Sequence, residues 1–302
     1  IVVVKKRSVI RTFFPTTTYT SRNVFMKSAI TSPSNPKGQR ILLAEDYEVN
    51  QKIGQLFLQN AGYRVDIAAN GQQAVEACQQ NHYDLILMDI QMPIMDGYAA
   101  TREIRAMEST IQNSKSEIDM VPIIAMTGCT YDASLDTDDN PGINDFIRKP
   151  AQWDQVLLVV QKWIDAESKA SMDKIQKEFV SSSVSKTKEN PSPLDMDKAI
   201  EEFMGQKEIL FGILQDFVNL AGAQIENIRR AVDCNNYGVI VSEAHAIKGG
   251  AANLTAYQLA DLASDLENAA REQKTDQTVL LAEKLDNEYY HLKMFLRPKL
   301  RT

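Results

Sequence analysis

Residues 84–97 read DLILMDIQMPIMDG, and this stretch decides the fold of the region around it. Its four consecutive apolar residues, Leu85 to Met88, are too few for a helix and end at the acidic residue Asp89. Pro93 and Gly97 then interrupt regular structure. The pattern predicts a buried parallel strand whose carboxyl end delivers Asp89 to a loop. In open α/β sheets the reactive crevice lies at such strand ends, so Asp89 is a candidate for chemistry.

The composition is that of a soluble globular protein. The chain has 302 residues, of which 44% are hydrophobic and 24% charged, and this length allows two domains with separate cores. A net charge of −7 argues against a nucleic-acid binder. Three widely spaced cysteines indicate a reducing compartment and a cytoplasmic location. No apolar run approaches the ~20 residues that a membrane span needs.

Short apolar runs alternate with helical spacing between residues 40 and 164. The runs that predict strands are 41–44, 65–67, 85–88, 121–126 and 145–148. The segments that predict helices are 49–60, 71–80, 98–107 and 152–164. This alternation predicts a parallel sheet covered by helices on both faces. Right-handed crossovers would bring the carboxyl ends of the central strands together.

Polar residues follow four of the five predicted strands. They are Glu45 and Asp46, Asp89, Thr127 and Lys149. An acid after a strand is most often a turn residue, so the prediction depends on all five together. Three converging carboxylates would raise one another's pKa, and a hard divalent cation relieves this repulsion. Mg²⁺ fits because it takes few protein carboxylates, and Lys149 and Thr127 would meet the charge of a phosphoryl group.

The last hundred residues follow the helical period throughout. Apolar stripes cover residues 210–228, 240–254, 259–270 and 281–296. Four amphipathic helices joined by short polar turns predict an antiparallel four-helix bundle. Packing in the core of such a bundle is sufficient to explain most of these residues.

One segment of the second stripe departs from this pattern. His245 lies one step off the apolar residues, with Lys248 and Gly249 on the same helical face. Two glycines in mid-helix, Gly249 and Gly250, cost about 1 kcal/mol each relative to alanine, which favours a function over an ordinary surface histidine. Lys248 would stabilise a phosphoryl group on the ring, and Gly249 would leave space for a docking partner.

Residues 39–166 resemble the receiver domain of two-component response regulators. The matching residues are Glu45-Asp46, the string MDIQMPIMDG at 88–97, Thr127 and Lys149-Pro150. The resemblance implies a five-stranded, flavodoxin-like, doubly wound fold. It also implies that Asp89 accepts a phosphoryl group from a phosphohistidine.

The same resemblance assigns further roles. The Mg²⁺ ligands that it implies are Asp46, Asp89 and the backbone carbonyl of Gln91, with Glu45 acting through water. It also implies that Thr127 and Lys149 contact the phosphoryl oxygens. Phe146 occupies the position at which the family has its switch aromatic residue.

Residues 194 to about 297 resemble the histidine phosphotransfer (HPt) domain, and the predicted domain covers 194–302. The match is His-x-x-Lys-Gly at 245–249 with the following Ala-Asn-Leu. It implies that His245 carries a phosphoryl group between aspartates, assisted by Lys248, with Gly249 giving access. Residues 167–193 are polar and predict a flexible linker. Residues 1–38 contain no acid and predict a disordered basic tail or a leftover linker.

Together the two resemblances predict a phosphorelay protein, as in the C-terminal part of a hybrid sensor histidine kinase. An upstream kinase domain would phosphorylate Asp89, His245 would take the group next, and a separate receiver aspartate would accept it last. No glycine-rich nucleotide loop is present, so kinase activity is not expected in this chain, and the parent kinase could be anchored in a membrane.

Two alternatives stay open. A hydrolase of the haloacid-dehalogenase type needs a second Asp where this chain has Gln91. An interaction module with inactive sites needs none of these residues to react.

Overall fold

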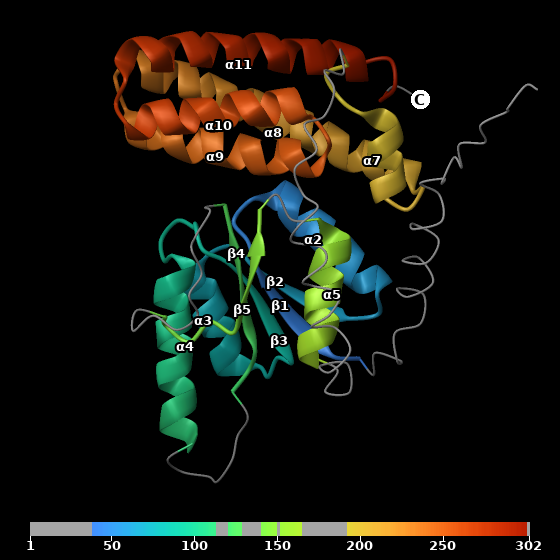
Figure 1. Cartoon of the computed structure of the whole chain (residues 1–302), viewed down its shortest axis with the longest axis vertical. Coiled ribbons are helices and arrows are strands. Elements are labelled where there is room, and N and C mark those ends of the chain that lie inside the picture. The colour runs from blue at the N-terminus through green and yellow to red at the C-terminus, as the bar shows by residue number, and fades with distance from the viewer. Residues whose placement is uncertain (1–37, 113–119, 129–139, 150–151, 165–191, 301–302) are drawn as a thin grey trace, which may run out of the picture. The chain divides into compact units, whose positions relative to one another are not determined.

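The computed structural model describes residues 38–112, 120–128, 140–149, 152–164 and 192–300 (Figure 1). All of them belong to one compact unit, Lys37–Thr302. The predicted basic tail and flexible linker lie outside the described residues, apart from their last one or two positions. Among the described helices, none combines the length and the apolar character that a membrane span requires.

The predicted parallel sheet is confirmed. Its strands are β1 (Arg40–Ala44), β2 (Arg64–Ala68), β3 (Leu85–Asp89), β4 (Ile123–Thr127) and β5 (Asp145–Arg148). They pair in the order β2-β1-β3-β4-β5, and every pair is parallel. In the register, Ala44 pairs with Met88 and Asp89 with Met126, so the carboxyl ends of β1, β3 and β4 meet at one edge. The strand order reverses between β1 and β3, where open α/β sheets place their ligand sites.

Helices cover both faces of this sheet, as predicted. They are α2 (Glu48–Asn60), α3 (Gly71–Gln80), α4 (Gly97–Gln112) and α5 (Trp153–Ile164). Helices α2 and α5 lie on one face of the sheet and α3 and α4 on the other (Figure 1). In β1, Ile41 and Leu43 belong to the apolar cluster that includes residues of α2 and α5, and Leu42 and Ala44 to the cluster that includes residues of α3 and α4. All four side chains are fully buried, which is why the strand has no polar alternation.

The C-terminal region is the predicted helical bundle. Its helices are α8 (Lys207–Asp233), α9 (Tyr237–Asn253), α10 (Tyr257–Arg271) and α11 (Thr275–Leu296). Helix α9 packs against α8 and α10, and α11 packs against α10 and α8. A further short helix, α7 (Met196–Glu202), was not predicted because seven residues are too few for a periodic stripe. Its N-cap is Asp195, whose side chain accepts from the Lys198 N–H.

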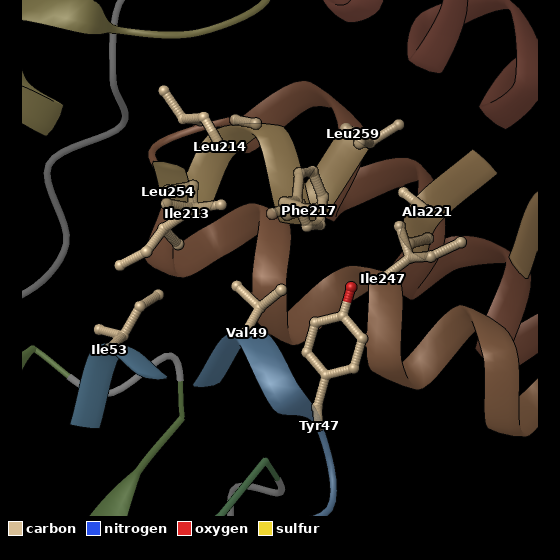
Figure 2. Close-up of a cluster of buried hydrophobic side chains, with 14 of the residues drawn as sticks. Tyr47, Val49, Ile53, Ile213, Leu214, Phe217, Ala221, Ile247, Leu254 and Leu259 are labelled. Atoms are coloured by element: carbon tan, nitrogen blue, oxygen red, sulfur yellow. The ribbon is translucent and has the colours of Figure 1, made fainter. Parts of the chain in front are cut away.

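Helix α2 packs on the sheet and also against the bundle. Tyr47 and the α2 residues Val49 and Ile53 are buried and belong to the same apolar cluster as Ile213 and Phe217 of α8 (Figure 2). One apolar core therefore continues from the sheet through α2 into the bundle.

Polar contacts surround this apolar junction. Lys52 Nζ donates to Asp216 Oδ2 at 2.7 Å, and Tyr47 Oη donates to Gln224 Oε1 at 3.3 Å. The Lys52–Asp216 pair is nearly half exposed, so it directs docking more than it stabilises it.

Candidate phosphotransfer site

Three acidic side chains meet at the carboxyl ends of β1 and β3. Glu45, Asp46 and Asp89 each place a carboxylate oxygen within 4.8 Å of the other two. Glu45 and Asp89 are 3% and 2% exposed, so their charges lie almost out of reach of water. The sequence predicted this convergence from the strand ends, and the register of β1 and β3 produces it.

Lys149 joins two of these carboxylates. Its Nζ lies 2.7 Å from Glu45 Oε2 and 2.7 Å from Asp89 Oδ2. The other oxygen of Asp89, Oδ1, accepts from the backbone N–H of Gln91 at 3.1 Å. Burial alone would lower the pKa of Lys149, but the Glu45 and Asp89 carboxylates outweigh it and raise that pKa, so the ammonium stays charged.

Lys149 does not fully compensate the burial and mutual repulsion of the carboxylates. Burial raises the pKa of Asp89 to about 6; Lys149 opposes this, while Glu45 and Asp46 add to it. Burial and Glu45 likewise raise the pKa of Asp46, against the opposing charges of Lys149 and His245. A site with excess negative charge and only oxygen donors suits a hard divalent cation.

The remaining predicted residues of this domain lie around the same edge. Thr127 ends β4 and is partly buried. Phe146 lies in β5, partly buried against the small cluster of Ile90, Ala125 and Ile143. Its ring is therefore packed beside the loop that follows Asp89.

His245 lies in α9 and is held by an acid that the sequence analysis missed. Its side chain is 18% exposed, and Nδ1 lies 3.1 Å from Oε1 of Glu267 in α10. An ionised carboxylate only accepts hydrogen bonds, so Nδ1 carries the proton and donates it to Glu267. The lone pair of the neutral ring is then on Nε2, which is the nucleophilic atom.

Glu267 is buried, with 4% of its surface exposed, and it contacts three basic side chains. Lys248 Nζ donates to its Oε2 at 2.5 Å and Arg271 Nη2 donates to Oε1 at 2.6 Å. Burial by itself would raise the pKa of Glu267, but hydrogen bonds from His245, Lys248 and Arg271 lower it to about 2. The carboxylate therefore orients both His245 and Lys248.

The faces carrying His245 and Asp89 are turned toward each other. A Cβ built on Gly128, the residue after β4, would lie 3.9 Å from Lys248 Nζ. Gly249 and Asn253 of α9 line a small pocket together with Glu45 and Lys149. The face of α9 that carries His245 and Lys248 thus lies at the carboxyl ends of the strands.

Two glycines of α9 permit this approach. A Cβ on Gly249 would lie 3.2 Å from Asn50 Nδ2, which is tight. A Cβ on Gly250 would lie 2.5 Å from Tyr47 Cε1 and 2.9 Å from Phe217 Cε2, which leaves no room for a side chain. Gly249 was predicted to give access for docking, but Gly250 is the more constrained of the pair.

Comparisons with known proteins agree with both halves of the site. Residues 41–161 match the response regulator receiver domain, and residues 212–294 match the Hpt domain. The exact limits of the predicted domains stay predictions.

Three similar proteins illustrate the match. Hybrid signal transduction histidine kinase B of Dictyostelium discoideum is 40% identical over 129 residues, 42% of this chain and 7% of that protein. Sensor protein GacS of Pseudomonas syringae pv. syringae is 28% identical over 224 residues, 74% of this chain and 24% of that protein. A solved receiver domain of a Pseudomonas aeruginosa sensor histidine kinase, with a magnesium ion in its active site cleft, is 40% identical. It covers 43% of this chain and 99% of that one, with a TM-score of 0.37.

The chain therefore spans less than a quarter of the two curated relatives. The two family matches show a response regulator receiver domain followed by an Hpt domain. The homologues of this chain are hybrid histidine kinases.

Proposed function

We propose that this chain relays a phosphoryl group from the phosphohistidine of a kinase to Asp89, then to His245, and finally to an aspartate of another receiver. The observation that carries the proposal is the facing pair of sites. Asp89 is bridged by Lys149 at 2.7 Å, and His245 is oriented by Glu267 at 3.1 Å. Lys149 provides a positive charge beside the Asp89 carboxylate, which accepts the group first. Glu267 holds the proton of His245 on Nδ1, so that Nε2 is available for the second transfer.

In the first transfer an oxygen of Asp89 attacks the phosphorus. A P–O bond to the carboxylate forms as the P–N bond to the donor histidine breaks. The group brings negative charge to a site that already holds three carboxylates. Lys149 offsets part of this charge, and the Thr127 hydroxyl at the end of β4 would donate to a phosphoryl oxygen.

The acidic residues fit Mg²⁺ as the remaining counter-charge. Both oxygens of Glu45 already accept hydrogen bonds, from Asn50 Nδ2 at 2.9 Å and Lys149 Nζ at 2.7 Å. Both oxygens of Asp89 likewise accept hydrogen bonds, from Lys149 Nζ and the Gln91 N–H, so these contacts alone do not rank the ligands. Following the resemblance to receiver domains, we assign Asp46, Asp89 and the Gln91 carbonyl as the residues that would hold the ion directly, with Glu45 acting through water. When bound, Mg²⁺ neutralises charge on the phosphoryl oxygens.

In the second transfer Nε2 of His245 attacks the phosphorus of the acyl phosphate. A P–N bond forms while the P–O bond to Asp89 breaks, and the carboxylate is restored. The ring becomes more positive as it takes the group, and the Nδ1 proton stays hydrogen-bonded to Glu267. Because this bond strengthens as positive charge develops, Glu267 favours phosphorylation of His245.

The test is to incubate the purified chain with Mg²⁺ and acetyl phosphate and to measure the stability of the bound label. Label on Asp89 is an acyl phosphate, which is lost in base and retained in mild acid. Label on His245 has the opposite stability. We expect both kinds in the wild type, only the base-labile kind in His245→Gln, and neither in Asp89→Asn.

Two results would contradict the proposal. Label that persists at wild-type levels in Asp89→Asn would place the chemistry elsewhere. Absence of both labels, when a phosphorylated donor kinase also fails, would favour an interaction module with inactive sites. The hydrolase alternative lacks its second acid because Gln91 stands at that position.

A further inference from the structure

A chain of amides connects the acidic site with the helix that carries His245. Asn50 in α2 donates from Nδ2 to Glu45 Oε1 at 2.9 Å, and its Oδ1 accepts from Asn253 Nδ2 at 2.9 Å. Asn253 ends α9. Asn50 is only 6% exposed, so water does not substitute easily for either bond.

Only one orientation of the Asn50 amide satisfies both neighbours. The Glu45 carboxylate has no proton to donate, so it requires the NH₂ end of Asn50. The carbonyl end of Asn50 is then directed to Asn253, which offers its own NH₂ group. A reversed amide would place oxygen against carboxylate and NH₂ against NH₂. The direction of one bond therefore determines the direction of the other.

Little space surrounds this amide pair. A small, partly open pocket of about 20 Å³ lies between Glu45, Lys149 and Trp153 on one side and Gly249 and Asn253 on the other, with room for about one water molecule. Within the part of the chain that the structure describes, the buried Asn253 Oδ1 has no hydrogen-bond partner. Among those residues, Asn253 is thus oriented through Nδ2 and Asn50.

We propose that the Asn50–Asn253 pair is a positioning device that couples docking of the HPt domain to the state of Glu45, and hence to the affinity of the acidic site for Mg²⁺. This inference rests on the proposed function, since it concerns the same two sites. When the bundle is docked, Asn253 holds Asn50 on Glu45, and Lys149 holds the other oxygen of that carboxylate. Docking therefore restrains Glu45, and without Asn253 this carboxylate is freer to turn toward a bound cation.

The coupling acts in both directions. If docking weakens Mg²⁺ binding by holding Glu45, bound Mg²⁺ weakens docking by the same factor. Asn50 and Asn253 are positioning residues in this scheme, since they act through Glu45.

The experiment is a Mg²⁺ titration of the full chain, followed by fluorescence of Trp153, which lines the pocket. Trp163→Phe in every variant removes the other of the two tryptophans. We expect Asn253→Ala to tighten Mg²⁺ binding about threefold or more, although Asn253 belongs to the bundle. Asn50→Ala removes the bond to Glu45 as well as the bond from Asn253, so it should tighten Mg²⁺ binding at least as much. The double variant should bind Mg²⁺ as Asn50→Ala does, because Asn253 acts only through Asn50.

The matched control is Gln224→Ala. Gln224 is also a neutral amide of the bundle with one hydrogen bond to the receiver side, through Tyr47, but it does not contact Glu45. The Gln224→Ala substitution should leave the Mg²⁺ affinity unchanged. An Asn253→Ala affinity equal to that of the wild type, or a change matched by Gln224→Ala, would overturn the proposal.

A second readout separates this inference from the proposed function. With acetyl phosphate, Asn253→Ala should still label Asp89, while transfer to His245 should be about fivefold slower, since one hydrogen bond is worth about 1 kcal/mol. Unchanged transfer would overturn the positioning role. If no variant and no wild type is labelled, the proposed function fails, yet the Mg²⁺ titration still decides whether the coupling exists.

Discussion

Glu267→Gln is the most informative single change in the bundle. It keeps the size of the side chain and an oxygen that can accept from His245 Nδ1. It removes the charge and replaces Oε2, the oxygen that accepts from Lys248, by an NH₂ group. The wild-type carboxylate has three basic partners within 3.1 Å. They hold its pKa at about 2, against an ordinary value of 4.5.

This pKa gives the size of the effect on stability. One pKa unit corresponds to about 1.4 kcal/mol, so the ionised Glu267 stabilises the folded chain by up to about 3 kcal/mol at neutral pH. Because the folded pKa is the lower one, this contribution is fully present above pH 4.5. It is lost as the pH falls from 4.5 toward about 2.

The assay is denaturant unfolding of the full chain, wild type and Glu267→Gln, at a series of pH values, followed by helix content. We expect the variant to be less stable by about 1–3 kcal/mol between pH 5 and pH 8. The difference should shrink below pH 4.5. The matched control is Glu272→Gln, the same chemical change at an exposed position just after α10, and it should cost less than about 0.5 kcal/mol.

The same variant also tests the role of Glu267 in transfer. Replacing a charge-assisted hydrogen bond by a neutral one should slow transfer from Asp89 to His245 about tenfold, because such bonds are roughly twice as strong. A stability difference that stays constant from pH 6 to pH 3 would refute the assigned pKa. Wild-type transfer kinetics would refute the catalytic part of the reasoning.

Two further predictions concern the acidic site and the junction. Asp89 has a folded pKa of about 6, above its ordinary 3.8, so stability from this group falls as the pH rises between those values, and Asp89→Asn should be more stable than the wild type at pH 7. Denaturant unfolding checks this, and equal stability at pH 7 would argue against a strained carboxylate. Gly250→Val should slow transfer to His245 more than tenfold while Asp89 still accepts from acetyl phosphate, because even a Cβ would lie 2.5 Å from Tyr47. Transfer at the wild-type rate in this variant would show that the contact with Tyr47 is not needed.

Much of the fold could be predicted from local patterns alone. The helix predicted at 71–80 has those bounds in the structure, and the strands lie where short apolar runs end in polar residues. The convergence of Glu45, Asp46, Asp89 and Lys149 followed from the same reasoning, because parallel strands with right-handed crossovers align their carboxyl ends. The geometry of the sheet converts positions along the chain into neighbours in space.

Other parts could not be read in this way. Helix α7 is too short to show a period, and Glu267 stands beside the apolar stripe of α10 with no spacing that connects it to His245, 22 residues earlier. The only local signal was an acid at the edge of a buried face. A helical period tells which side of a helix is buried, but it does not tell which residue of the neighbouring helix lies opposite.

The sequence by itself determined the two folds, the acid at the end of β3 and the histidine of α9, because strand ends and helical stripes are local properties of the chain. Only the tertiary structure decided that Glu267 orients His245 and that Asn50 meets Asn253, 203 residues away. These pairs depend on how α9, α10 and α2 are rotated and placed against one another. That placement results from the packing of complete side chains such as Tyr47 and Phe217, and no pattern within a single helix encodes it.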